Sequence, residues 1–135
     1  MDATAVRIFE NETARKWADG LASRDNLWIV REALKAVIYT DCFLDDDRAF
    51  EGLAACEVVA RLKGNWGLRD ESTSTIDAWV EAHPLPVPDD LVKIAADAID
   101  RTLTPESDLY QSWTDLGVFD AWEAALIDLK RRVLE

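Results

Sequence analysis

Apolar residues recur every three to four positions along almost the whole chain, and this spacing constrains the fold more than any other feature. Between Asn26 and Thr40 the apolar residues form one helical stripe: Leu27, Val30, Leu34, Val37 and Ile38. A helix with such a stripe buries it against other helices. No sustained alternation of apolar and polar residues, which would indicate strands, interrupts the pattern. The sequence therefore predicts an all-α fold.

Start and stop signals divide this pattern into a bundle of about six to seven helices. Asn11 is a good N-cap for the first helix, and Gly64 and Gly117 are good stop signals for the third and the sixth. Thr104 before Pro105 predicts the start of the sixth helix, with the proline at the first helical position. The remaining helices are expected from about residues 26, 45 to 47, 72 to 75, 89 and 119.

The third expected helix is apolar on nearly all sides between Ala49 and Ala60, which predicts a central position in the bundle. Residues 83–88 contain three prolines, so they predict an extended connector and not a helix. Folding units of about 80 and 50 residues on either side would each be marginal alone. We therefore expect one helical domain over residues 1–135, with an extended N-terminal segment at 1–8.

The charge of the chain is strongly negative. Twenty-seven Asp and Glu oppose fifteen Lys and Arg, which gives a formal net charge of −12. Such a surface repels phosphate backbones and attracts basic proteins. We therefore expect no nucleic-acid partner and consider a basic protein partner possible, with solubility alone as the alternative role of the charge. Two carboxylate patches are the candidate partner-binding residues: Asp41, Asp45, Asp46, Asp47 and Glu51, and then Asp108, Asp115 and Asp120.

The residue types that usually carry chemistry are scarce. A single histidine, His83, and two separated cysteines, Cys42 and Cys56, do not meet the common zinc patterns or a disulfide framework. The glycines stand singly, so no phosphate-binding loop is present. The Asp45–Asp47 run lacks the ligand spacing of a calcium loop and suits a helix start instead. We expect no catalytic, cofactor or metal site.

No stretch of the sequence has the length and apolarity of a membrane span, and the first residues do not resemble a signal peptide. The expected location is therefore the cytoplasm, without membrane contact.

Glu57 is the most unusual polar residue, because it lies inside the most apolar helix. A buried carboxylate has to be paired, hydrogen-bonded or protonated. We expect a structural role, with an arginine such as Arg101 or the indole N–H of Trp113 as its partner. A perturbed acid or base is the functional alternative.

The six tryptophans divide into two groups. Trp17, Trp79, Trp113 and Trp122 lie on apolar helical faces and are expected in the core, whereas Trp28 and Trp66 are expected to be partly buried.

Three segments carry a family resemblance. They are Phe9-Glu10-Asn11-Glu12-Thr13-Ala14-Arg15-Lys16-Trp17, Leu53-Ala54-Ala55-Cys56-Glu57-Val58-Val59-Ala60, and Ala98-Ile99-Asp100-Arg101 with Glu106-Ser107-Asp108-Leu109-Tyr110-Gln111-Ser112-Trp113. In this order they resemble the bacterial DUF4259 family, a domain of unknown function. Members typically open with a Trp-Gly-x-Gly run, where this chain has Thr4-Ala5-Val6-Arg7. The resemblance implies a helical fold and assigns no activity.

Three functions are compatible with these features. The first is a non-enzymatic acidic binding protein, such as an immunity or antitoxin-like protein that neutralises a basic bacterial effector. The second is a small carboxylate-dependent enzyme with Glu57 as acid or base. The third is an oligomeric helical scaffold, which would require an exposed apolar helix face.

Overall fold

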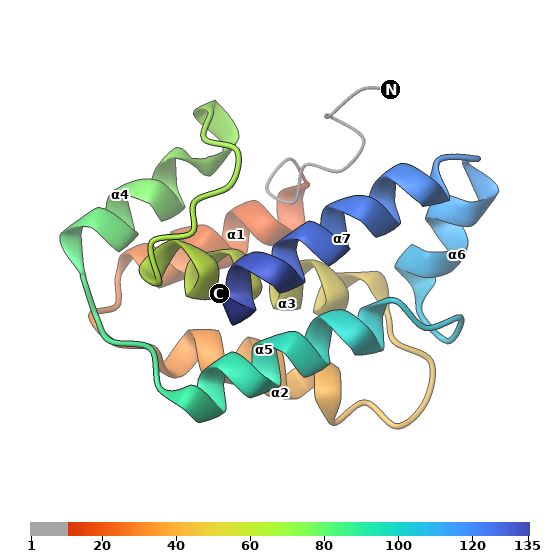
Figure 1. Cartoon of the computed structure of the whole chain (residues 1–135), viewed down its shortest axis with the longest axis horizontal. Coiled ribbons are helices and arrows are strands. Elements are labelled where there is room, and N and C mark those ends of the chain that lie inside the picture. The colour runs from red at the N-terminus through yellow and green to blue at the C-terminus, as the bar shows by residue number, and fades with distance from the viewer. Residues whose placement is uncertain (1–10) are drawn as a thin grey trace.

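The computed structural model describes residues 11–135, and these residues form an all-α bundle (Figure 1). They hold seven α-helices and one short 3-10 helix: α1 (Glu12–Ala22), α2 (Trp28–Ile38), α3 (Asp46–Leu62), η3 (Glu71–Thr73), α4 (Ser74–Ala82), α5 (Asp89–Thr102), α6 (Asp108–Asp115) and α7 (Phe119–Leu134). The predicted fold class is confirmed. The second helix is two residues shorter at each end than the predicted range from Asn26 to Thr40.

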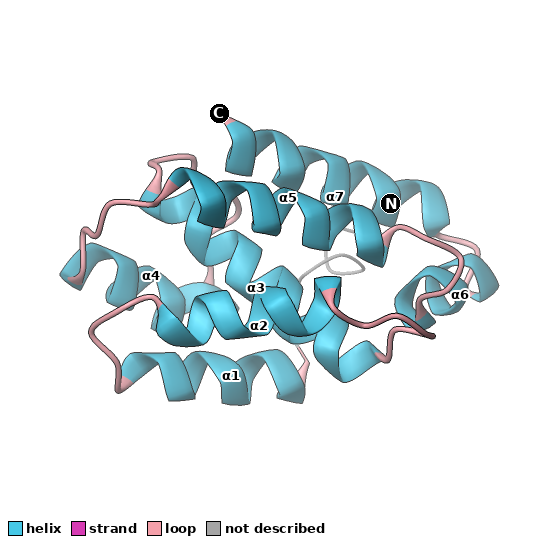
Figure 2. Cartoon of the chain, turned by 90° about the horizontal axis from the view of Figure 1, so that it is seen from below, coloured by secondary structure: helices cyan, strands magenta, loops and turns pink. Residues whose placement is uncertain are grey.

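The third helix, α3, is the centre of the bundle, as expected. It packs against each of the other six α-helices, and every residue from Gly52 to Arg61 is buried. Figure 2 shows α3 between α1 on one side and α5 and α7 on the other. A Cβ on Gly52 would lie 2.5 Å from Cγ2 of Val37 on α2. The glycine inside α3 therefore permits a close approach of these two helices.

Several helices begin and end at the capping residues that the sequence predicts. The Asn11 side chain accepts a hydrogen bond from the amide of Ala14 at 2.7 Å and so caps α1. Gly64 and Gly117 have φ angles of 88° and 76°, in the left-handed region that follows many helices. After α3 the amide of Gly64 donates to Arg61 and that of Asn65 to Ala60, which closes a Schellman motif.

The predicted start of the sixth helix is wrong. The helix α6 begins at Asp108, with Ser107 as its N-cap residue, and not at Pro105. The reason is tertiary, because the preceding residues pair with the loop between α2 and α3. Leu44 donates its amide to the carbonyl of Glu106 at 2.8 Å and accepts from the amide of Asp108 at 2.9 Å. This isolated parallel bridge between Leu44 and Ser107 holds Ser107 in an extended conformation after a turn at Pro105 and Glu106, so the helix starts only at Asp108.

The tryptophans largely follow the expectation. Trp17, Trp79 and Trp122 are core residues, whereas Trp113 is only partly buried. Trp66 is partly buried, as expected. The prediction for Trp28 is wrong, since it is 58% exposed in the first turn of α2.

The proline-containing residues 83–88 connect α4 and α5 without helix, and the helices on both sides of them contact α3. The expected extended segment at 1–8, with its Thr4-Ala5-Val6-Arg7 departure from the family pattern, lies outside the described residues. Within residues 11–135 none of the helices combines the length and apolarity that crossing a membrane requires.

Candidate functional site

Two groups of charged residues stand out, one buried and one exposed, and the buried group centres on Glu57. The glutamate is only 8% exposed, which confirms its predicted burial. Arg132 of α7 binds it with both terminal nitrogens, at 2.9 Å to Oε2 and 3.1 Å to Oε1. Arg61, one turn further along α3, also donates to Oε1. Both carboxylate oxygens are therefore engaged by guanidinium groups.

The same arginines recruit two further carboxylates. Nε of Arg61 donates to Asp77 of α4 at 2.8 Å, and Nε of Arg132 donates to Asp128 at 3.0 Å. Asp77 also accepts from the hydroxyl of Thr73 at 2.6 Å. We call Glu57, Arg61, Asp77 and Arg132 the buried quartet. It joins α3, α4 and α7 with equal numbers of positive and negative groups, as charges inside a protein require.

A strap formed by residues 63–70 closes over the buried quartet. Arg61 donates to the carbonyl of Leu68 at 2.6 Å, and the side chain of Asn65 donates to the carbonyl of Arg132 at 2.9 Å. The ring of Trp66 lies 5.7 Å from the guanidinium of Arg61 and 4.2 Å from that of Arg69, within cation–π range. Carbonyl groups of the strap therefore accept hydrogen bonds from the arginine N–H groups that do not bind a carboxylate.

Gly67 lets the strap lie against the Arg132 guanidinium. A Cβ at this position would stand 2.8 Å from both Cζ and Nη1 of Arg132. The arginine cannot easily move aside, because Glu57 and Asp128 hold it. Burial lowers the pKa of Arg132, but its hydrogen bonds and charge contacts with these two carboxylates outweigh that effect and raise it. Arg132 therefore stays charged.

The expected partners of Glu57 are wrong. Arg101, predicted as the buried counterion, is partly exposed and donates instead to Thr104 Oγ1 and to three carbonyls, those of Thr40, Cys42 and Glu106. The reason is its place near the C-terminal end of α5, beside backbone carbonyls of two loops. Trp113 lies on α6 and is not among the groups bonded to Glu57. The i, i+4 spacing of Glu57 and Arg61 on one helix was the sequence signal for the true partner.

The second group is exposed and lies where the Leu44–Ser107 bridge joins two loops. Residues 39–51 carry five carboxylates and one base, and residues 104–120 carry four carboxylates and no base. The bridge brings the two segments together, and in Figure 1 the α2–α3 loop, α6 and the start of α7 occupy one end of the molecule. We call this surface the acidic end. It unites the two predicted patches: Asp41, Asp45, Asp46, Asp47, Glu51, Asp108, Asp115 and Asp120.

Arg101 has a role at this end that its sequence position did not suggest. Its guanidinium reaches carbonyls of the α2–α3 loop, Thr40 and Cys42, and the carbonyl of Glu106 in the loop before α6. It binds backbone oxygens and not the neighbouring carboxylates, of which Asp45 pairs with Arg48 at 3.6 Å. Arg101 therefore clamps the two loops of the acidic end to each other.

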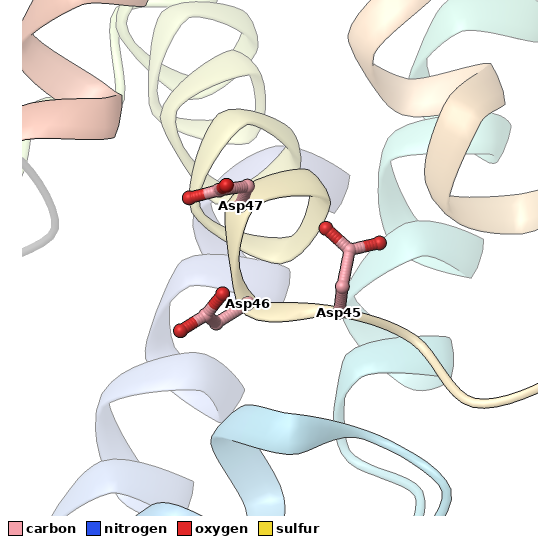
Figure 3. Close-up of side chains that lie close together, drawn as sticks. All are labelled: Asp45, Asp46 and Asp47. Carbon is pink, nitrogen blue, oxygen red and sulfur yellow. The ribbon is translucent and has the colours of Figure 1, made fainter.

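Two of the three consecutive aspartates at the start of α3, Asp45 and Asp47, have separate partners. Asp45 accepts from the amide of Arg48 at 3.1 Å and caps the helix, and Asp47 accepts from the hydroxyl of Thr13 at 2.7 Å. One oxygen from each of Asp45, Asp46 and Asp47 lies within 4.8 Å of the others. Figure 3 shows Asp46 and Asp47 directed to one side of the helix start and Asp45 to the other. This is the arrangement of a solvated helix start.

The carboxylates of the acidic end repel one another. Burial, and then the charges of Asp47 and Asp45, raise the pKa of Glu51 above its ordinary value. A cation placed beside this surface would remove part of the repulsion.

Two aromatic side chains are exposed beside these carboxylates. Tyr39 is 73% exposed and Phe43 is 43% exposed, and both lie on the loop that Arg101 clamps. Exposed aromatic rings are typical anchors of protein interfaces. The sequence analysis did not single out this pair, although both rings stand next to the predicted carboxylates.

A cavity of about 870 Å³ lies on a different face, between α1 and the start of α4. Glu57 does not line it. Its lining is mostly polar: Arg15, Ala18, Asp19, Asp70, Glu71, Ser72 and Thr75.

Comparison with protein families identifies the chain. The model of the family described as "Domain of unknown function (DUF4259)" matches residues 3–125, so the chain belongs to this family and the resemblance seen in the sequence is confirmed. Searches of curated proteins and of solved structures gave no match.

Proposed function

We propose that this member of the DUF4259 family is a non-enzymatic binding protein that takes up a basic protein partner on its acidic end. Immunity proteins and antitoxins that neutralise a basic bacterial effector are the functional class we have in mind, with the cytoplasm as the place of action. The observation that carries the proposal is the bridge that joins residues 39–51 to residues 104–120, which gathers segments with nine carboxylates and a single base at one end of the molecule (Figure 1).

Electrostatics supports a basic partner in two ways. A surface of one sign accelerates the encounter with an oppositely charged protein, by factors that fall steeply with salt. In addition, the pKa of Glu51 is raised first by burial and then by the charges of Asp47 and Asp45, and a bound cation would relieve this second, repulsive contribution. Because the carboxylates repel one another in the free protein, binding of a positively charged ligand is favoured.

The surroundings of Glu57 favour a structural role over the acid or base of an enzyme. Both of its oxygens bind arginines, and the strap covers these groups. A general base needs an oxygen within reach of a substrate proton. The quartet is therefore better suited to holding helices together than to proton transfer.

A peptide in which lysine alternates with glycine tests the proposal with a defined probe. We expect it to bind the full chain at low salt and to dissociate at high salt. The variant Asp41→Asn/Asp46→Asn/Asp108→Asn should bind it at least ten-fold more weakly. The control Asp25→Asn/Glu71→Gln/Asp89→Asn makes the same change of charge on exposed residues outside the acidic end. Equal losses in the two variants would refute a localised site. A basic protein encoded beside the gene is the natural partner to test next.

A further inference from the structure

We propose that the acidic end recognises arginine side chains of its basic partner, and that the exposed rings of Tyr39 and Phe43 confer the preference for arginine over lysine. This inference rests on the proposed function and names the chemistry that the surface selects. It assigns a specificity role to two residues that the charge of the chain alone would not indicate.

The composition of the loop carries the first part of the inference. From Tyr39 to Phe43 the chain places an aromatic ring at each end and the carboxylate of Asp41 between them, and all three side chains are exposed. A guanidinium is planar and weakly hydrated, so it can lie on a ring face while its N–H groups reach a carboxylate. A lysine ammonium is compact and strongly hydrated and gains less from the ring.

The shape of the loop carries the second part. Arg101 holds the carbonyls of Thr40 and Cys42, and the hydroxyl of Thr40 bonds to the carbonyl of Ala36 at 2.7 Å. Leu44 is fixed on the other side by its bridge to Ser107. A loop held at both ends and in its middle presents its rings without a large ordering cost on binding. Arg101 is therefore a positioning residue for the rings.

Trp28, the third exposed aromatic residue in the described part of the chain, provides a natural contrast. Trp28 is 58% exposed, but it lies at the opposite end of α2, with Arg24 already 5.7 Å from its ring centroid. Its ring is thus taken by a cation of the same chain. Tyr39 and Phe43 have no such cation–π contact among the described residues.

The test compares two peptides of equal length and charge, in which either arginine or lysine alternates with glycine, on the full-length protein. We expect the parent protein to bind the arginine peptide more tightly. Tyr39→Ala/Phe43→Ala should lower its affinity about five-fold, and the ratio between the peptides should approach one. Tyr39→Leu/Phe43→Leu, which retains apolar area without rings, should behave in the same way. Trp28→Ala is the matched control and should leave both affinities unchanged.

Each outcome separates this inference from the proposed function. If the parent binds both peptides equally, or if the ring variants retain the arginine preference, the inference is refuted while a salt-sensitive acidic site still stands. If the leucine variant retains the preference, apolar contact and not the rings is responsible, and the inference is again refuted. If the peptides also bind the Asp41→Asn/Asp46→Asn/Asp108→Asn variant as tightly as the parent, the proposed function itself fails. Circular dichroism should show all variants folded, since the changed side chains are exposed or partly exposed.

Discussion

Replacement of Glu57 by glutamine is the sharpest test of the buried quartet, because it removes one charge and almost no volume. In the parent the carboxylate binds Arg61 and Arg132, whose side chains are 1% and 9% exposed. Breaking a buried pair from one side costs about 3–5 kcal/mol. Here Asp77 still pairs with Arg61 and Asp128 with Arg132, so we expect the lower end, about 3 kcal/mol.

This loss of stability should be visible in simple unfolding experiments. The unfolding entropy of globular domains is about 2.1 cal/mol/K per residue, so a chain of 135 residues that loses about 3 kcal/mol should melt roughly 10 °C lower. Circular dichroism at the helix minimum measures the melt, and tryptophan fluorescence in urea checks the free energy of unfolding. Trp66 lies over the quartet and reports on the strap.

A matched control distinguishes the buried charge from charge in general. Glu81→Gln removes a carboxylate whose side chain is 58% exposed and pairs with Arg69 at the rim of the same network. Such surface changes usually stay within about 0.5 kcal/mol. A Glu57→Gln protein that melts with the parent would refute the pairing role. So would equal losses in the two variants.

Three further predictions concern single positions. Gly67→Ala should destabilise the fold by about 1–3 kcal/mol in urea unfolding, because its Cβ meets the Arg132 guanidinium; an unchanged midpoint would show that this arginine is free to move. Glu51→Gln should be more stable than the parent at neutral pH, since a carboxyl whose folded pKa is raised disfavours the folded state once it is ionised. This gain should vanish at a pH well below the ordinary glutamate pKa, and a constant difference would refute it. Burial raises the pKa of Cys56, so under native conditions Ellman's reagent should modify Cys42 and leave Cys56 unreacted.

The helices could be predicted well because their signals are local. The cap of Asn11, the stops at Gly64 and Gly117 and the apolar interior of α3 each involve neighbouring residues, and the structure confirms them. The start of α6 failed for the opposite reason. A proline with a threonine before it favours a helix start locally, but the bridge to Leu44 holds Ser107 extended, and the helix begins only after it.

The site residues divide in the same way. Burial of Glu57 follows from its apolar helix, whereas one of its partners, Arg132, is 75 residues away and belongs to another helix. Arg101 was chosen as a partner by residue type alone, and its position beside two loops gave it carbonyls instead. The union of the two carboxylate patches also depends on a tertiary contact, so composition could indicate the patches but not that they form one surface.

The contrast between the two charged groups bears on why the acidic end exists. Inside the bundle the chain matches each buried carboxylate with a guanidinium, as Glu57 with Arg132 and Asp77 with Arg61. At the acidic end Arg48 pairs with Asp45 at 3.6 Å, while Arg101 beside it binds carbonyls, so nine carboxylates share a single paired base among the described residues. Folding does not require this excess, since the repulsion from Asp47 and Asp45, which adds to burial in raising the pKa of Glu51, opposes the folded state. Solubility does not require it either, because dispersed charges serve solubility as well as clustered ones. The carboxylates of the acidic end oppose folding, and solubility does not require them to be clustered. Their clustering therefore supports the proposed positively charged partner.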